Sequence, residues 1–342
     1  MNITSETTAL KLTCQGGHTG FLDCVDLMRR HPDLQVLVNS NERCDVLHSH
    51  SWGPGYLLQG VRYSGRRILT AHATPESAEG SLPFMNAGTR ILIRRYLTRV
   101  FNYSDVVVAV APETANSIRQ LGVTSTIETI PNAIRTDRFF PSATLRREGR
   151  FLLGLEPDDM VVLGVGQLQP RKGIQDFVEA ARALPHVQFV WAGGRPFGLV
   201  SAGLRELARL AEAAPPNMKF AGMFDLERMP VIYNAADILL FPSFQELCPY
   251  ATVEAAACGL PVVYRRLPQY DALYRRPYLS AVDAPGFVAV LSELLSSPLR
   301  LRRAREISRE IAGMFGMDAF VNALAQVYHD VACGRVAPRE VA

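Results

Sequence analysis

The chain alternates short runs that are almost wholly apolar with longer segments in which apolar residues recur every three or four positions. Apolar runs such as Ile238–Phe241 are typical of strands covered on both faces, as in a parallel sheet, and Ile174–Leu184 has the spacing of a helix. Strands and helices that alternate over the whole length predict a doubly wound α/β architecture. The expected strands are Leu10–Cys14, Leu34–Val38, Asp45–His48, Ile68–His72, Val106–Val110, Ile127–Ile130, Met160–Gly166, Gln188–Ala192, Met218–Phe220, Ile238–Phe241 and Pro261–Tyr264.

This alternation runs twice, and the proline-containing polar segment 131–141 between the two series predicts a linker. We therefore expect one Rossmann-like domain over residues 1–140 and a second over residues 141–316. The apolar pattern of Met317–Cys333 predicts a closing helix within residues 317–342, packed back on the first domain. Two such domains are expected to enclose a cleft, with ligands beyond the carboxyl ends of the strands.

Composition narrows the class of protein. Of 342 residues 48% are apolar, which excludes an intrinsically disordered chain, and no run of apolar residues is long enough for a transmembrane helix. The start, Met1–Glu6, lacks the features of a secretory signal. The six cysteines form no C-x-x-C pair, so we expect reduced thiols in a cytoplasmic protein, with neither disulfides nor a zinc site.

The second half opens with an apolar strand, residues 162–165, followed by the polar loop Gly166–Gly173, in which Arg171 and Lys172 are adjacent. The free N–H groups of the helix expected after this loop add to the two cations. Such a loop suits a phosphate group, and a solvated basic turn is the alternative. Gln169 stands at the third glycine position of a dinucleotide fingerprint, which disfavours a nicotinamide-dependent oxidoreductase.

The segment 238–263 is predicted as strand, loop, helix and strand, with Pro249 in the first helical turn and Gly259 just after the helix. Glu246 then stands at the end of a strand, where ligands bind, and Glu254 lies within a helix of small residues, where a charge needs a partner. Carboxylates accept paired hydrogen bonds, such as those that neighbouring sugar hydroxyls offer. The alternative is two ordinary helix and surface glutamates.

Together, the loop 166–173 after its strand, the pair Glu246 and Glu254, and the segment 131–134 (Pro-Asn-Ala-Ile) resemble retaining glycosyltransferases of family 4, which have the two-domain GT-B fold. The resemblance covers nearly the whole chain. It implies that Lys172 binds the diphosphate of a nucleotide-sugar donor, that Glu246 contacts the transferred sugar and that Glu254 holds the ribose. It also implies that residues 141–316 form the donor domain and residues 1–140 the acceptor domain.

The donor-binding residues that this resemblance implies are Gly16, Gly17, Gln167, Arg171, Lys172, Glu246, Leu247, Cys248, Pro249 and Glu254. The chain departs from the family pattern at two of them. Gln167 replaces a frequent arginine, which removes one diphosphate cation that Arg171 is placed to replace, and Pro249 replaces a frequent glycine.

In the first half, Gly16 and Gly17 open the segment 16–20, expected as a loop where the backbone closely approaches a phosphate or an acceptor, or else as an ordinary surface turn. His72 ends an expected strand, and the resemblance implies that it hydrogen-bonds the donor sugar near the reacting carbon. The expected catalytic residues are His72, Glu246 and Lys172.

Two further histidines, His48 and His50, are two residues apart and could share a strand face. Because the sequence offers no third ligand nearby, no metal site is expected there. The resemblance likewise implies no cofactor besides the donor substrate.

A basic stretch distinguishes the first half: residues 60–100 hold seven arginines against two acidic residues. On a helix over residues 90–101, arginines share one side and apolar side chains the other, which favours an anionic membrane surface. An ordinary helix with its apolar side in the core is the alternative. Nucleic acid is not expected, because no aromatic stacking platform accompanies the arginines. The proposed membrane contacts are Arg90, Arg94, Arg95 and Arg99.

Segments 38–51, 70–77 and 188–198 look most like bacterial diglycosyl-diacylglycerol synthases. This resemblance implies transfer of a hexose from UDP-glucose or UDP-galactose to a (monoglycosyl-)diacylglycerol, at the inner face of the cell membrane. A soluble GT-B enzyme with a non-lipid acceptor and a non-catalytic nucleotide-sugar-binding protein are the alternatives.

Overall fold

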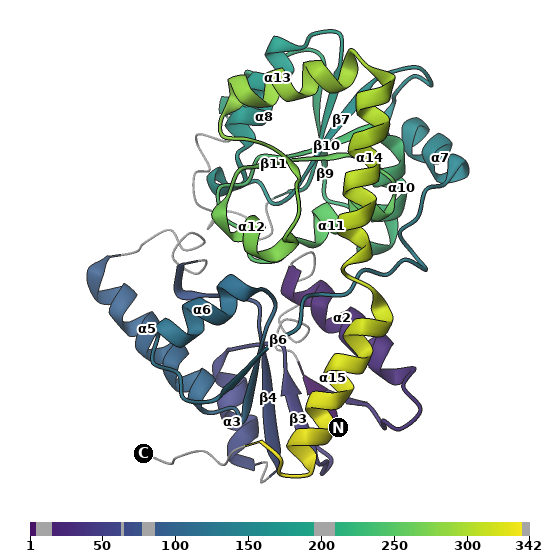
Figure 1. The fold of residues 1–342 in the computed structure, drawn as a ribbon. Coiled ribbons are helices and arrows are strands. Elements are labelled where there is room, and N and C mark those ends of the chain that lie inside the picture. The colour runs from purple at the N-terminus through teal and green to yellow at the C-terminus, as the bar shows by residue number, and fades with distance from the viewer. Residues whose placement is uncertain (5–15, 63–64, 77–85, 195–208, 337–342) are drawn as a thin grey trace. The chain divides into compact units, whose positions relative to one another are not determined.

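The computed structural model describes residues 1–4, 16–62, 65–76, 86–194 and 209–336. These residues form two compact units: unit 1, Met1–Ala133 with Met317–Ala342, and unit 2, Ile134–Gly316. Each unit contains a six-stranded parallel sheet flanked by helices (Figure 1), so the predicted doubly wound α/β class is confirmed. The expected strand Leu10–Cys14 lies outside the described residues.

The sheet of unit 1 has the order β2-β1-β3-β4-β5-β6. Its first strand, β1, has only three residues, too few for an apolar pattern, and sequence analysis missed it. It is nevertheless an internal strand of the sheet, because Ile3 pairs with Val38 on one side and His48 on the other. The strands are β1 (Asn2–Thr4), β2 (Leu37–Val38), β3 (Val46–Ser49), β4 (Arg66–Ala71), β5 (Val106–Ala109) and β6 (Thr126–Thr129).

Side chains of unit 1 alternate between two cores. Val46 and Ile68 pack with helices α2 (Gly16–Arg29) and α15 (Met317–Ala332), whereas Leu47 and Leu69 pack with the helices on the opposite face. The last described helix of the chain therefore completes the core of its first unit (Figure 1). The helices of the opposite face are α3 (Pro54–Arg62), α5 (Ala87–Asn102) and α6 (Pro112–Gln120).

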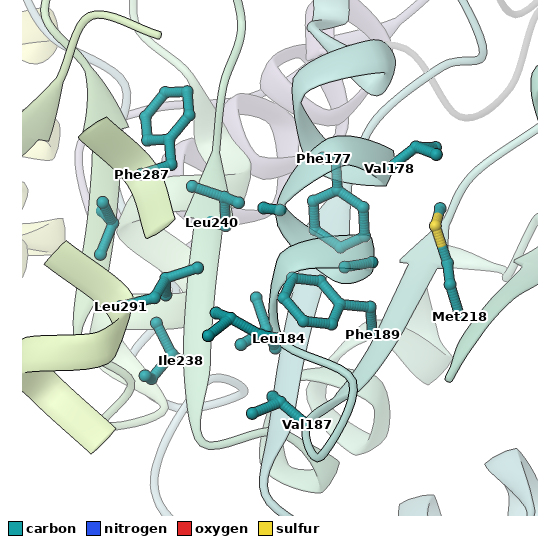
Figure 2. Packing of buried hydrophobic residues seen from close by; sticks show 14 of the residues in the cluster. Phe177, Val178, Leu184, Val187, Phe189, Met218, Ile238, Leu240, Phe287 and Leu291 are labelled. Atoms are coloured by element: carbon teal, nitrogen blue, oxygen red, sulfur yellow. The ribbon is translucent and has the colours of Figure 1, made fainter. Parts of the chain in front are cut away.

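The sheet of unit 2 has the order β12-β11-β10-β7-β8-β9. Every residue of β10 is buried, as a central strand covered on both faces requires. Figure 2 shows the core between this sheet and helices α8 (Ile174–Ala183) and α13 (Ala284–Leu295). The strands are β7 (Val161–Val165), β8 (Gln188–Ala192), β9 (Met218–Gly222), β10 (Ile238–Phe241), β11 (Val262–Arg265) and β12 (Leu279–Ala281).

Among the remaining described helices of unit 2, α10 contacts α7, and α11 contacts α14. Helix α7 begins after Ser142, whose hydroxyl accepts a hydrogen bond from the backbone N–H of Leu145. Residues Ile134–Gly316, which include most of the expected linker 131–141, belong to unit 2. These helices are α7 (Ala143–Leu153), α10 (Met229–Ala235), α11 (Tyr250–Ala257), α12 (Pro268–Tyr274) and α14 (Pro298–Gly313).

Candidate functional site

The strand order of unit 2 reverses between β7 and β10, which lie side by side. From β7 the chain continues to β8 on one side of the pair, and from β10 it continues to β11 on the other. Ligands of doubly wound sheets bind at such a switch point, beyond the carboxyl ends of the strands. The two loops that leave this point are 166–173, which carries Lys172, and 242–249, which carries Glu246.

These loops meet in an ion pair. The ammonium group of Lys172 contacts Oε1 of Glu246, and the two side chains are only 12% and 11% exposed. Burial lowers the pKa of Lys172, and the carboxylate of Glu246 opposes that effect. Sequence analysis named both residues, and the fold brings them into contact across 74 positions of the chain.

Glycine makes this close approach of the loops possible. Gly173 has a φ of +70°, and a side chain there would place its Cβ 2.1 Å from the carbonyl oxygen of Pro242. Gly166 lies against the aliphatic part of Lys172, where the Cβ of a larger residue would come within 3.4 Å of Cδ of the lysine. A larger residue at Gly173 would therefore push the Lys172 loop away from the Glu246 loop, whereas at Gly166 the φ of +153° is what disfavours a larger residue.

Neighbouring polar groups orient the pair. The hydroxyl of Ser243 donates to Oε1 of Glu246 at 2.6 Å, and the side chain of Gln269 donates to the Glu246 carbonyl at 3.3 Å. Arg171 donates to Oε1 of Gln169 at 2.8 Å and to the carbonyl of Gln245 at 3.4 Å, so its guanidinium lies against the same loop. Sequence analysis missed Ser243, whose only signal is its place two residues after a buried strand.

Glu254 lies inside α11 and is 6% exposed. The hydroxyl of Tyr233, a second residue that sequence analysis missed, donates to its Oε2 at 2.7 Å. Pro249 precedes the helix as its N-cap residue instead of lying in the first turn, and Leu247 and Cys248 lead into it. The free N–H groups at the start of α11 therefore follow directly on the Glu246 loop.

The remaining donor-loop residue is Gln167, which is half-buried, and its carbonyl accepts a hydrogen bond from the backbone N–H of Gln169 at 2.9 Å. Gly259 follows α11 with a φ of +85°, which confirms the expected end of that helix.

In unit 1, the expected loop 16–20 is wrong: Gly16 and Gly17 form the first turn of α2. A side chain at Gly17 would lie 3.5 Å from Cβ of His72, so the start of this helix packs against the histidine that follows β4. The structure thus places Gly17 and His72, two of the predicted site residues, next to each other. Glycine is a poor residue within a helix, which explains why the local pattern of this turn indicates a loop.

Two polar contacts connect β3 and the residue after it with β4 and the residue after it. His48 contacts Thr70 Oγ1 through Nε2 at 2.7 Å and Tyr328 of α15 through Nδ1 at 2.6 Å. His50 Nδ1 contacts His72 Nε2 at 2.9 Å. Burial lowers the pKa of His48 to about 3 and that of His72 to about 4, so both imidazoles are neutral at neutral pH.

Among the described residues, Cys24, His48 and His50 place their potential ligand atoms within 4.8 Å of one another. Both ring nitrogens of His48 are already hydrogen-bonded, however. Burial also raises the pKa of Cys24 to about 12, so without a metal its thiol is protonated. The described geometry therefore favours a hydrogen-bonded cluster over a metal centre.

The sequence profile described as "Glycosyltransferase Family 4" matches residues 20–138, and the profile described as "Glycosyl transferases group 1" matches residues 159–297. The chain is 32% identical to alpha-galactosylglucosyldiacylglycerol synthase of Streptococcus pneumoniae, over 88% of this chain and 83% of that protein. It is 30% identical to D-inositol 3-phosphate glycosyltransferase 2 of Catenulispora acidiphila, over 83% of this chain and 70% of that protein.

Among solved structures, HepE of Anabaena in complex with UDP-glucose is similar, with a TM-score of 0.77 and 15% identity. The match covers 96% of this chain and 99% of HepE. At this identity the likeness shows a common fold. No described helix is long and apolar enough to cross a membrane.

Proposed function

Because the chain belongs to the group 1 and family 4 glycosyltransferases, we propose that it transfers a hexose from UDP-glucose or UDP-galactose to diacylglycerol or monoglycosyl-diacylglycerol. It is a hexosyltransferase of the GT-B fold, related to diacylglycerol glycosyltransferases. The contact between Lys172 and Glu246 at the switch point of unit 2 is the observation that carries the proposed chemistry.

The leaving group of this reaction is a nucleoside diphosphate, so catalysis depends on neutralising its growing negative charge. The loop 242–249 contacts Lys172 and Arg171 and leads directly into α11. The two side chains and the free N–H groups at the start of the helix supply positive charge there. We assign the diphosphate to these groups. The carboxylate of Glu246, held by Ser243, is then placed to accept hydrogen bonds from the hydroxyls of the transferred sugar, and Glu254 from those of the ribose.

In this proposal two side-chain cations and a helix N-terminus take the place that a divalent metal has in other transferases. We also assign to His72, which follows β4 and packs on Gly17, a contact with the transferred sugar. The proposed reaction requires no cofactor besides the donor.

Two classes of acceptor fit the related proteins. The 32% identity to a diacylglycerol glycolipid synthase supports a lipid, whereas the 30% identity to an inositol phosphate glycosyltransferase favours a soluble acceptor as the second candidate.

A labelled-donor experiment separates these candidates. Radiolabelled UDP-glucose or UDP-galactose is incubated with diacylglycerol, monoglucosyl-diacylglycerol or inositol 3-phosphate, and products are read by thin-layer chromatography beside UDP release. We expect labelled glycolipid with one of the two donors, and an undiminished rate in EDTA. A labelled inositol phosphate would select the second candidate. Donor binding without any product would leave a non-catalytic protein.

Exposed arginine and apolar side chains on α5 support the proposed membrane attachment. Leu97, Val100 and Phe101 pack in the core of unit 1, as the alternative of an ordinary helix predicts for that side. The outer side combines arginines with Ile91 and Leu92, which are 53% and 65% exposed. Of the four proposed arginines, Arg90, Arg95 and Arg99 are exposed, and Arg94 pairs with Glu76 at 3.3 Å. We propose that this side of α5 lies on the anionic inner face of the cell membrane.

Vesicle flotation tests that attachment. Each arginine near an anionic surface contributes about 1 kcal/mol, so the double variant Arg95→Glu/Arg99→Glu should bind anionic vesicles at least roughly thirtyfold more weakly at low salt. The matched control Arg302→Glu/Arg309→Glu makes the same charge change at two exposed arginines of α14 and should bind like the wild type. Equal flotation of both double variants would contradict the assignment to α5.

A further inference from the structure

His50 and His72 are joined in a way that restricts where their protons lie. His50 Nδ1 and His72 Nε2 are 2.9 Å apart, and their rings are stacked with centroids 5.2 Å apart. Only one of the two nitrogens carries the shared proton, so the tautomer of one ring dictates the tautomer of the other.

The other nitrogen of His50 decides between the two arrangements. His50 is 6% exposed, and its Nε2 is buried with no hydrogen-bond partner among the residues that the structure describes. A proton on Nε2 would bury an unpaired N–H donor, whereas an unprotonated Nε2 leaves only an unpaired acceptor, and orphaned donors are the rarer of the two in folded proteins. The proton of neutral His50 therefore belongs on Nδ1.

With that proton, His50 donates to His72 Nε2, and His72 must carry its own proton on Nδ1. The ring of His50 is fixed in place by an edge contact with Phe21, at a centroid distance of 5.9 Å, and by His48, at 4.6 Å. Helix α2, which supplies Phe21, also packs Gly17 against His72. The same elements thus hold both imidazoles.

We propose that His50 is a positioning residue that fixes His72 as the Nδ1-protonated tautomer. His72 then offers the sugar a hydrogen-bond donor. It has no free lone pair with which to act as a base, because its Nε2 accepts from His50. This inference rests on the proposed function, in which His72 contacts the transferred hexose.

Ring ¹⁵N spectra of histidine-labelled protein test the tautomer directly, without any turnover. The His72 signals are assigned as those lost in His72→Gln. In the wild type we expect His72 protonated at Nδ1. In His50→Asn, whose amide can still donate from near the Nδ1 position, this tautomer should persist. In His50→Asp, whose carboxylate only accepts, the proton should move to Nε2. His50→Leu, which buries no charge, should give a mixture and serves if His50→Asp fails to fold.

Transfer kinetics complete the test. His50→Asp and His50→Leu should lower kcat about tenfold, the effect of one ordinary hydrogen bond, with little change in the KM for donor, and His50→Asn should restore most of the rate. An Nε2-protonated His72 in the wild type, or an unchanged tautomer in His50→Leu, would overturn the proposal. A changed tautomer with unchanged kcat would overturn its catalytic part. Failure of the proposed function shows separately, as no transfer by the wild type.

Discussion

Replacing Lys172 with alanine is expected to lower the rate of sugar transfer about 10²- to 10³-fold, as loss of one group that stabilises transition-state charge does in other enzymes. Lys172 is a cation at the switch point whose side chain is only 12% exposed, and its ammonium lies directly against Glu246. In the proposed site, the departing diphosphate would then keep Arg171 and the start of α11 but lose the charge of Lys172. Steady-state UDP release at saturating donor and acceptor measures the loss.

The chain offers a matched control in Lys219, another lysine of unit 2. Its ammonium donates to the carbonyl oxygens of Leu153 and Gly154 at 2.7 and 3.1 Å, at the end of α7. Lys219→Ala should therefore transfer sugar at close to the wild-type rate and lose only about 0.3–1 kcal/mol of stability. If folded Lys172→Ala protein transferred sugar as fast as Lys219→Ala, the proposed role of Lys172 would be wrong.

The largest expected effect on stability comes from Asp237, which precedes β10. Its carboxylate accepts from Arg150 at 3.0 Å, from Arg146 at 2.7 Å and from the backbone N–H of Val161 at 2.9 Å. Arg150 is only 4% exposed. Asp237→Ala leaves that guanidinium buried without its counter-charge, which should cost about 3–5 kcal/mol in the free energy of unfolding of unit 2.

Urea unfolding followed by tryptophan fluorescence measures this cost for unit 2 alone, because the chain has two tryptophans and each unit contains one of them. In a Trp52→Phe background, buried Trp191 of β8 reports on unit 2 alone. The control Arg146→Ala removes a partner that is 36% exposed, so its effect should stay within about 1 kcal/mol. Equal unfolding midpoints for Asp237→Ala and Arg146→Ala would argue against a buried-charge penalty.

The pattern of apolar and polar residues was sufficient to predict an element wherever that element depends mainly on its own stretch of sequence. The strand before Gly166 and the strand Ile238–Phe241 were predicted from their apolar runs, and this placed Lys172 and Glu246 at strand ends. Pattern failed where an element is short or locally unfavourable: β1 has three residues, and the first turn of α2 begins with two glycines.

Supporting residues of the site lay beyond sequence reasoning for a different reason. Ser243 and Tyr233 are ordinary polar residues whose importance comes only from the carboxylates that they contact. Likewise, His50 differs from other buried histidines because His72 faces one of its nitrogens. Such contacts join segments that sequence spacing does not relate.

By itself, the sequence determined the α/β class, the repeated alternation and the polar residues of the two loops that follow β7 and β10, because periodicity and strand-end polarity are local properties. Only the tertiary structure decided that β7 and β10 are neighbours, so that Lys172 meets Glu246, and that α15 returns to complete unit 1. Strand order and helix docking are set by burial summed over each whole core, which no single segment of the chain records.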